Sequence, residues 1–292
     1  MANLRYDNWG LVGAVDDTQL FYGVRGSGRP LLLLDGIGCD GWAWKHIQPR
    51  LSENYQTVHC HYRGHGRSGS PVDPDRIGIE DLRADVLRVM EHLELNEVAL
   101  MAHSMGTQVA LEVYRTIGER VRAMVLVCGT DGKVTHTFHG NDLLHRVLPR
   151  LIEYVQRYRP VALALWRRLP AEFAYRVAKL IGEVDGPALD PRDFKEYVQH
   201  LSDIDLSLYL DMLARAGAHT ATDLLPQVAV KTLVIAAERD TFTPRDVVKA
   251  MAQAIPNSQY EELVGASHAG PAEQPQRVVE SVLHFLAQAD YR

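Results

Sequence analysis

Cysteines and long apolar runs are scarce in this sequence, and both absences narrow the class of protein. Its 292 residues include three cysteines, Cys39, Cys60 and Cys128, whose odd number and spacing fit no metal-binding motif. We expect reduced thiols in a cytoplasmic protein without a metal site. No stretch of about 18 uninterrupted apolar residues is present, which argues against a membrane span. Residues 1–7 lack the apolar segment of a secretory signal, so we expect none.

Positive charge is also in short supply. The formal net charge is −6, the sequence pI is about 6.1, and no tract of lysines and arginines occurs. A nucleic-acid-binding surface is therefore not expected. Hydrophobic residues make up 46% and charged residues 23% of the chain, ordinary values for a globular protein with a large buried core.

Predicted strands and helices alternate over the first 130 residues. A hairpin is predicted at 11–24, around Asp16-Asp17, where apolar and polar residues alternate. Short apolar runs are typical of strands buried on both faces, and apolar residues spaced three and four apart are typical of the helices that cover them. On this basis we predict strands at 31–34, 57–62, 97–102 and 123–127, and helices at 42–52, 79–93 and 109–117. Such alternation indicates a parallel sheet wrapped by helices.

The alternation stops near Gly132. Residues 133–225 have a helical pattern without a convincing strand, and prolines at 160, 170, 187 and 191 divide it into several helices. Strand and helix patterns return at 230–236, 247–254, 259–264 and 278–286. We therefore predict one α/β core, formed by residues 1–132 and 226–292, that is interrupted by a helical cap insertion at 133–225.

A serine lies where a predicted strand runs directly into a helix. The segment from Val98 to Ala110 has this pattern, with Ser104 at the joint. A serine on such a sharp turn is pushed out above the sheet, and the small residues Ala102 and Gly106, two positions before and after it, relieve the crowding. The start of the helix also supplies backbone N–H groups that stabilise developing negative charge. These features predict that Ser104 is a nucleophile; the alternative is a serine that caps an ordinary helix.

A serine hydroxyl needs a base to take its proton, and the base needs an acid that orients it. Among 13 histidines we select His268, because the loop Gly265-Ala266-Ser267-His268 follows the last predicted strand at the carboxyl edge of the sheet. Asp240 follows the strand at 230–236 and is expected at the same edge. Asp131 and Glu238 are alternative acids, since each also follows a strand, and any of the three could be a turn former only.

With these residues identified, the chain resembles the α/β-hydrolase superfamily over essentially its whole length. Besides the serine turn and the Gly-x-x-His loop, two motifs carry the resemblance. Leu34-Asp35-Gly36-Ile37-Gly38 is similar to the family's oxyanion loop, and Arg63-Gly64-His65-Gly66-Arg67-Ser68 is similar to its R-G-x-G-x-S turn. The resemblance implies a mostly parallel, eight-stranded sheet with helices on both faces and an inserted all-helical cap. It also implies that the backbone N–H groups of Ile37 and Met105 form an oxyanion hole.

One position departs from the family pattern. Asp35 stands where relatives usually have histidine, and a carboxylate beside an oxyanion site would oppose the charge that catalysis must stabilise. We expect its side chain to point away, held by backbone N–H groups or by a basic residue, or else to be protonated.

These residues predict hydrolysis of a small-molecule acyl substrate, a carboxylic ester or lactone, through an acyl-enzyme on Ser104. The chemistry requires no metal or organic cofactor. Trp42, His103 and Trp166 are candidates for the substrate pocket, with internal packing as the alternative role for each. Two other hypotheses stay open: hydrolysis of a carbon–carbon bond in a diketone-type substrate by the same three residues, and a non-catalytic ligand receptor on the hydrolase fold.

Overall fold

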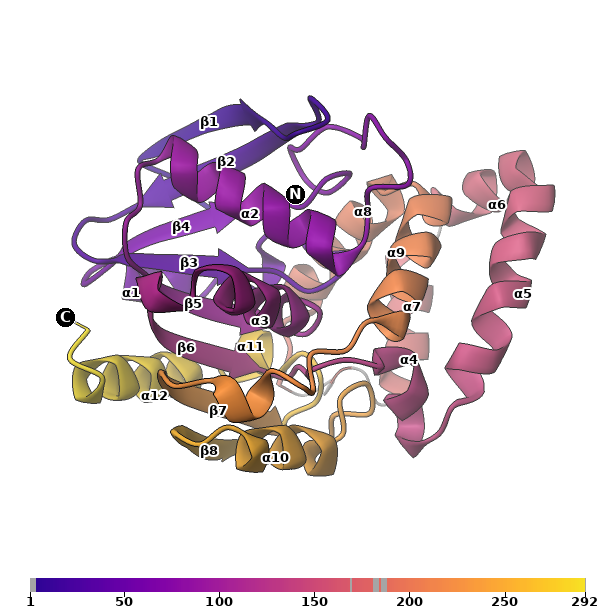
Figure 1. Ribbon diagram of the computed structural model, residues 1–292. Helices are drawn as coiled ribbons and strands as arrows, with labels where there is room; N and C mark the ends of the chain where they lie inside the picture. Colours follow the sequence, from indigo (N-terminus) through magenta and orange to yellow (C-terminus); the bar gives the residue numbers. More distant parts are fainter. Residues whose placement is uncertain (1–3, 169, 181–183, 185–187, 292) are drawn as a thin grey trace.

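Eight strands form a single, mostly parallel sheet in the computed structural model, which describes residues 4–168, 170–180, 184 and 188–291 (Figure 1). The strand order is β1-β2-β4-β3-β5-β6-β7-β8; β2 is antiparallel to both of its neighbours, and the other pairings are parallel. The sheet predicted from the sequence is thereby confirmed. Its strands are β1 (Asn8–Gly13), β2 (Gln19–Arg25), β3 (Pro30–Leu34), β4 (Gln56–Cys60), β5 (Val98–His103), β6 (Val121–Val127), β7 (Lys231–Ala237) and β8 (Ser258–Leu263).

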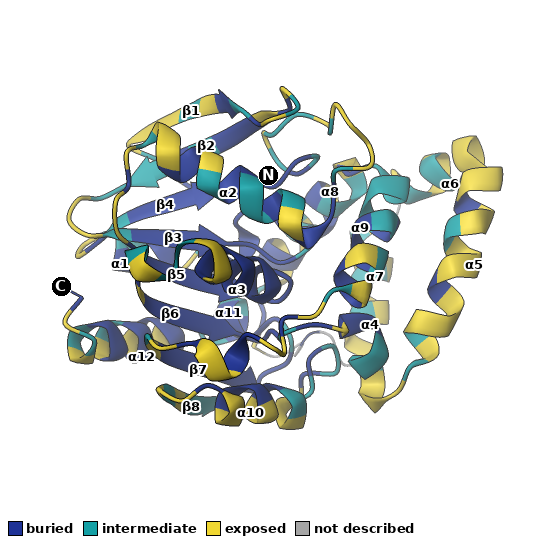
Figure 2. Cartoon of the chain, in the orientation of Figure 1, coloured by how far each residue is buried: buried dark blue, intermediate teal, exposed yellow. Residues whose placement is uncertain are grey.

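Helices cover both faces of the sheet. The side chains of β3 alternate between the faces: Leu31 and Leu33 pack into one apolar cluster, and Leu32 and Leu34 pack into the other. The central strands β3 to β7 are largely buried, whereas the edge strand β1 and the outward faces of the helices are largely exposed (Figure 2). The cluster with Leu31 and Leu33 is covered by α1 (Gln48–Leu51), α11 (Gly270–Glu273) and α12 (Pro275–Gln288). The cluster with Leu32 and Leu34 is covered by α2 (Ile79–His92), α3 (Gly106–Ile117) and α10 (Arg245–Ala254). A short 3₁₀ turn, η2 (Gly118–Arg120), follows α3.

The single helix predicted at 42–52 is wrong. The structure has two short pieces there, a 3₁₀ turn η1 (Trp42–Trp44) and the one-turn helix α1. Pro49 is the physical reason, because proline has no N–H to donate to the carbonyl of residue 45 and its ring crowds that carbonyl. Pro49 therefore disfavours a continuous helix through this segment, although its apolar spacing favours one.

The segment between β6 and β7 forms the helical cap, and its described residues contain no strand. The cap lies at one end of the sheet, with α5 and α6 farthest from it (Figure 1). Pro160 and Pro191 lie in the first turns of α6 and α8, Pro170 directly precedes α7, and Pro187 lies outside the described residues. None of the described helices has the length and apolar character needed to cross a bilayer. The elements of the cap are α4 (Val134–Thr137), η3 (Phe138–Gly140), α5 (Leu143–Arg157), α6 (Arg159–Trp166), α7 (Ala171–Leu180), α8 (Pro191–Asp203), α9 (Leu206–Ala218) and η4 (Leu225–Gln227).

Asp193, near the start of α8, fastens the cap to the core. Its carboxylate accepts a hydrogen bond from Lys45 Nζ at 2.7 Å and lies 2.6 Å from His46 Nε2. Its backbone carbonyl accepts the indole N–H of Trp42 at 2.8 Å. Because three contacts converge on one residue, α8 is held directly above the loop that follows β3.

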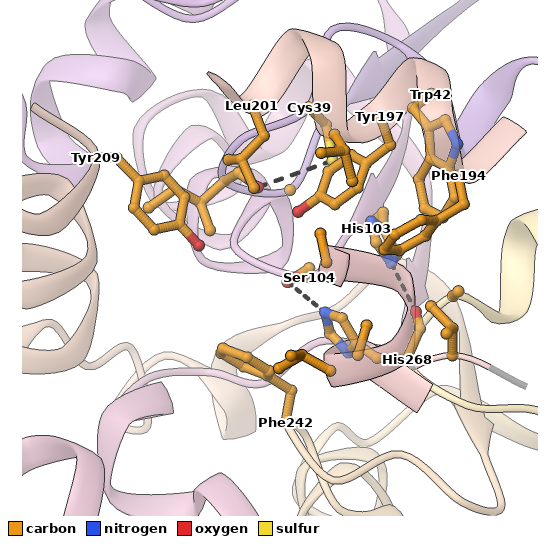
Figure 3. A pocket seen from close by; sticks show the side chains of 18 of the residues that line it. Cys39, Trp42, His103, Ser104, Phe194, Tyr197, Leu201, Tyr209, Phe242 and His268 are labelled. Carbon is orange, nitrogen blue, oxygen red and sulfur yellow. Dashed lines mark hydrogen bonds between the residues drawn. The ribbon is translucent and has the colours of Figure 1, made fainter. Parts of the chain in front are cut away.

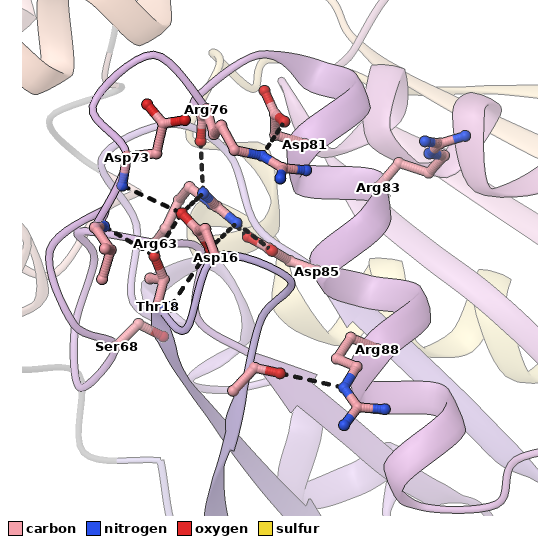
Figure 4. Close-up of polar contacts among 12 residues, drawn as sticks. Asp16, Thr18, Arg63, Ser68, Asp73, Arg76, Asp81, Arg83, Asp85 and Arg88 are labelled. Atoms are coloured by element: carbon pink, nitrogen blue, oxygen red, sulfur yellow. Dashed lines mark hydrogen bonds and ion pairs between the residues drawn. The ribbon is translucent and has the colours of Figure 1, made fainter.

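The R-G-x-G-x-S turn is a structural junction. Arg63 is 1% exposed, and its guanidinium donates to Asp85 of α2 at 2.7 Å and to Asp16 of the β1–β2 turn at 3.0 Å (Figure 4). Ser68 Oγ accepts the Phe21 N–H at 2.9 Å. The turn thus joins the N-terminal hairpin to α2, so its role is structural.

Candidate active site

Ser104 lies on a strained turn between β5 and α3. Its φ is +53°, in the left-handed region that residues other than glycine rarely adopt, and such strain is typical of a serine held above the edge of a sheet. Gly106 is required by the same turn, because a Cβ there would lie 2.4 Å from the carbonyl oxygen of Leu34. Ala102, in contrast, fits fully buried in β5. The turn therefore accepts a methyl group before the serine but not after it.

Three side chains from three loops form a hydrogen-bonded chain. His268 Nε2 lies 3.0 Å from Ser104 Oγ (Figure 3). On the other side of the ring, His268 Nδ1 lies 2.9 Å from Asp240 Oδ2. The three residues follow β5, β8 and β7, whose parallel arrangement brings their carboxyl ends to one edge. With a carboxylate at Nδ1, the imidazole carries its proton there and turns the lone pair of Nε2 toward the serine hydroxyl. This is the arrangement that a general base needs.

The carboxylate of Asp240 is itself fixed in place. Its Oδ1 accepts the backbone N–H groups of Phe242 and Thr243, both at 2.8 Å. Its Oδ2 accepts the hydroxyl of Thr243 at 2.7 Å in addition to the imidazole N–H of His268. Four donors therefore hold a fully buried carboxylate in one orientation.

The two rival acids are engaged elsewhere. Asp131 accepts hydrogen bonds from the hydroxyls of Thr130 and Thr222, and Glu238 accepts the N–H of Gly265 at 2.7 Å. Of the three acids, Asp240 is the one with a described contact to His268.

Two backbone N–H groups beside Ser104 are free to bind an oxyanion. Neither the N–H of Ile37 nor that of Met105 donates a hydrogen bond within the described part of the chain. Met105 is the N-cap of α3, so its N–H belongs to the positive end of the helix dipole. Gly36 allows the loop to approach closely, because a Cβ there would lie 3.0 Å from the Cβ of Ser104. Both expected donors thus lie on segments that adjoin the serine.

Ser104 and His268 face a cavity of about 300 Å³ between the core and the cap (Figure 3). No Lys, Arg, Asp or Glu is found among its described lining residues. The core contributes Gly36, Ile37, Cys39, Trp42, His103, Phe242 and Ala269, and the cap contributes Phe173, Ala174, Val177, Ala178, Val184, Phe194, Tyr197, Val198, Leu201 and Tyr209. The cavity therefore favours an apolar group beside the serine.

A family model described as the alpha/beta hydrolase fold matches residues 29–275. The chain belongs to the α/β-hydrolase family. It is 27% identical to the "Putative carbamate hydrolase RutD" of Azorhizobium caulinodans over 94% of this chain and 97% of that protein. Among solved structures it is similar to a thermophilic esterase from Thermogutta terrifontis, with a TM-score of 0.75 and 23% identity over 97% of this chain and 99% of that one. It is also similar to the enol-lactonase from Burkholderia xenovorans LB400, with a TM-score of 0.76 and 21% identity over 95% and 100% of the two chains. At these identities the structural likenesses show the fold alone.

Asp35 of this α/β-hydrolase is held by the two kinds of partner expected for it, a backbone N–H and a basic residue. Its Oδ2 accepts the N–H of Gly41 at 2.8 Å and lies 2.8 Å from His59 Nε2, with both side chains fully buried. His59 Nδ1 lies 2.7 Å from the hydroxyl of Tyr6. Burial and the nearby Asp35 carboxylate raise the pKa of Tyr6, so the phenol stays protonated and donates to His59. These contacts brace both ends of the loop that carries Ile37.

His103 is a neutral neighbour of His268. Burial and the adjacent His268 lower the pKa of His103 to about 4, so the ring is uncharged at neutral pH. Its Nε2 donates to the backbone carbonyl of His268 at 3.2 Å. His103 thus supports the histidine loop of the hydrolase without adding a positive charge beside a protonated His268.

The three pocket candidates from the sequence have different outcomes. Trp42 and His103 line the cavity. Trp166 is not among its described lining residues. Its indole N–H donates to the carbonyls of Leu201 and Ile204, both at 3.1 Å. Its ring lies 6.1 Å from that of Tyr209, which does line the cavity. Trp166 therefore packs behind the cavity wall of the hydrolase.

The cysteines of this hydrolase are free and buried. Cys39 lines the cavity, but burial and the carboxylates of Asp35 and Asp40 raise the pKa of its thiol well above the usual value. A thiol is a poor nucleophile until it is deprotonated, so Cys39 does not compete with Ser104 at neutral pH.

Several residues of the site escaped prediction from the sequence. Thr243 holds the Asp240 carboxylate, and its position three residues after an aspartate was a usable signal for an Asx-type turn. His59 lies in a buried part of strand β4, where a histidine needs a polar partner. Phe194, Tyr197 and Leu201 of α8 line the cavity, but helical spacing alone does not reveal which face of a cap helix looks toward the serine.

Proposed function

We propose that this α/β-hydrolase cleaves a carboxylic ester or lactone through an acyl-enzyme on Ser104. The observation that carries the proposal is the chain of contacts from Ser104 Oγ to His268 Nε2 at 3.0 Å and from His268 Nδ1 to Asp240 at 2.9 Å, at the wall of an apolar cavity. The sequence resemblance and the family membership support it.

In the proposed mechanism, His268 Nε2 takes the proton of Ser104 as Oγ attacks the substrate carbonyl carbon. The N–H groups of Ile37 and Met105 stabilise the negative oxygen of the tetrahedral intermediate, and each such donor contributes roughly 10²–10³-fold to the rate. The C–O bond to the leaving group then breaks, and His268 gives its proton to the departing alkoxide. Water, deprotonated by His268, attacks the acyl carbon and releases the acid and Ser104.

The lining of the cavity supports an uncharged, apolar acyl group as substrate. A charged group would lose its hydration there without an ionic partner among the described lining residues, and burial of an unpaired charge is costly. A cavity of about 300 Å³ lies at the small end of the usual range for ligand pockets. We therefore expect short or medium acyl chains to be preferred over long ones.

Labelling with a fluorophosphonate followed by peptide mapping tests the nucleophile. The adduct is expected on Ser104, and turnover of p-nitrophenyl esters is expected to disappear in Ser104→Ala. An adduct on another residue, or undiminished ester turnover in the variant, would overturn the proposal.

Parallel assays with an aryl carbamate and a diketone-type substrate test the other chemistries. The carbamate assay is included because several relatives of this chain are named for that activity. Cleavage of a carbon–carbon bond without ester turnover would favour the diketone hypothesis. Tight ligand binding that Ser104→Ala leaves unchanged, with no turnover, would favour a receptor.

A further inference from the structure

Helix α5 has an unusually broad apolar face, and only one side of it is packed. Leu148 and Val155 are buried on the side that contacts α9. A second row of apolar side chains, spaced four, four, three and four residues apart, faces solvent, and such spacing places them along one stripe of the helix. A surface helix normally buries its apolar face, so this exposed stripe needs an explanation. Its members are Leu143 (61% exposed), Val147 (48%), Leu151 (41%), Tyr154 (62%) and Tyr158 at the end of the helix (44%).

Helix α6 also carries exposed apolar side chains. Val161 and Leu165, four residues apart, are 60% and 69% exposed. Helices α5 and α6 contact each other and form the part of the cap farthest from the sheet (Figures 1 and 2). We call residues 143–166 the arm, and the seven exposed apolar residues on it the outer stripe. Exposed apolar surface on two adjoining helices marks a contact with another molecule or a lipid phase.

Arginines border the outer stripe. Arg146, Arg150 and Arg157 each lie three or four residues from a member of the stripe, so they are its neighbours on the helix surface, and all three are exposed. Arg150 and Arg157 form no ion pair with the described residues, whereas Arg146 pairs with Asp142. The arm contains four Arg and one Glu, a net charge of +3, in a chain whose net charge is −6. This positive charge is spaced along helices, which is why it does not appear as a basic tract in the sequence.

The combination of an apolar stripe and bordering arginines points to the kind of partner. Helices that lie in the plane of an anionic membrane surface insert an apolar face among the acyl chains and set basic side chains against the headgroup phosphates. A second copy of the chain that docked arm to arm would bring two faces of the same positive charge together. We propose that the arm docks this protein onto an anionic lipid surface. The excess negative charge on the rest of the molecule is repelled by such a surface, so the arm faces it.

The arm leads directly to the cavity wall. Helix α7 begins at Ala171, after α6 ends at Trp166, and its Phe173 and Val177 both line the cavity and are 59% and 38% exposed. A molecule docked by its arm would therefore hold an apolar opening of the cavity close to the lipid. The docking itself does not depend on the proposed ester hydrolysis.

Vesicle flotation of the full-length protein tests the proposal. The probes are vesicles of phosphatidylcholine alone and vesicles of phosphatidylcholine and phosphatidylserine in equal amounts. We expect binding to the mixed vesicles only, and weaker binding as added salt shortens the Debye length from about 10 Å to about 3 Å. The double variant Arg150→Gln/Arg157→Gln should bind about thirty-fold more weakly, because each basic residue near such a surface contributes about 1 kcal/mol. The double variant Leu151→Ser/Tyr154→Ser should also bind the mixed vesicles at least about ten-fold more weakly than the wild type.

Two further proteins serve as controls. Arg50→Gln/Arg277→Gln removes the same charge from exposed core positions and is expected to bind like the wild type. Ser104→Ala should bind like the wild type as well, which separates docking from hydrolysis. The proposal is overturned if the wild type ignores the mixed vesicles, if it binds neutral vesicles equally, or if the core double variant loses as much as the arm variant. It is also overturned if the outer stripe is needed for a dimer in sedimentation and that dimer does not bind lipid.

Discussion

Replacing Asp240 with asparagine should disable His268 without removing it. Asparagine keeps the shape of aspartate, but one of its two acceptor oxygens becomes an NH₂ donor. Oδ1 of Asp240 receives two backbone N–H groups, so the amide oxygen must stay on that side, and the NH₂ group must face His268 Nδ1 and the Thr243 hydroxyl. His268 Nδ1 then has to accept instead of donate, which moves the ring proton to Nε2. A protonated Nε2 in a neutral ring cannot take the proton of Ser104.

The size of the effect follows from this exchange of tautomers. In serine hydrolases with this arrangement, the same substitution lowers kcat by about 10⁴-fold while the geometry stays intact. We expect a loss of about that size in the initial rate of p-nitrophenyl ester hydrolysis, with KM changed by less than about three-fold because the acid does not line the cavity. A circular-dichroism spectrum like that of the wild type shows that the fold is retained.

Asp131→Asn is the matched control for this substitution. Asp131 accepts hydrogen bonds from two threonine hydroxyls and has no described contact with His268. The rate of ester hydrolysis by Asp131→Asn should therefore stay within about three-fold of the wild-type rate. The reasoning is refuted if Asp240→Asn keeps more than a tenth of the activity, or if Asp131→Asn is the slower variant.

Three further predictions concern stability. Gly106→Ala should lower the free energy of unfolding in urea by about 2–3 kcal/mol, because the new Cβ would lie 2.4 Å from a carbonyl oxygen; a loss under about 0.5 kcal/mol would show that the turn can relax. Asp35→Ala should cost about 3 kcal/mol in the same assay, since it strands the buried Gly41 N–H and His59 Nε2, and a neutral result would contradict the bracing role. His103 should make the protein acid-sensitive: its pKa is about 4 in the folded state against 6.5 in the unfolded chain, so the unfolded state takes up the proton first. The stability that His103 contributes is complete above pH 6.5 and is lost as the pH falls toward 4. Over that range, the free energy of unfolding of the wild type should therefore fall by about 2–3 kcal/mol more than that of His103→Asn. Equal decreases in the two proteins would disprove the assignment.

The strands of the core were predictable because burial on both faces of the sheet requires uninterrupted runs of apolar residues in the sequence. The run Leu31–Leu34 has no polar residue, and only a central parallel strand buries such a run completely. The position of Ser104 was predictable for a related reason, since a strand that passes into a helix through one strained residue requires small neighbours such as Gly106. The sequence favoured Asp240 but left Asp131 and Glu238 as alternatives, because all three follow strands at the same edge, and the contact with His268 is seen only in the structure.

The cap was less predictable than the core. Amphipathic spacing identifies a helix but does not say which side chains face the cavity. For this reason the sequence left Trp166 open between a place in the pocket and internal packing, and the structure places it outside the described lining. Helix α5 shows the same ambiguity, with one side of its apolar face on α9 and the other in solvent. The polar chain Tyr6–His59–Asp35 joins segments that are far apart in the sequence, and no local pattern announces such a contact.

The place at which the cap is inserted has an evolutionary consequence. β6 and β7 are neighbours, paired from Ala123 with Lys231 to Val127 with Ile235, so the inserted segment leaves and rejoins the sheet at adjoining points. A replacement segment of almost any length can span so short a gap, and lengthening it carries only a small entropic penalty. The cap part of the cavity wall and the proposed catalytic residues thus lie in separable stretches of one polypeptide. Grafting a foreign helical segment between these two strands should redirect what the protein accepts while leaving the serine, the histidine and the aspartate in register.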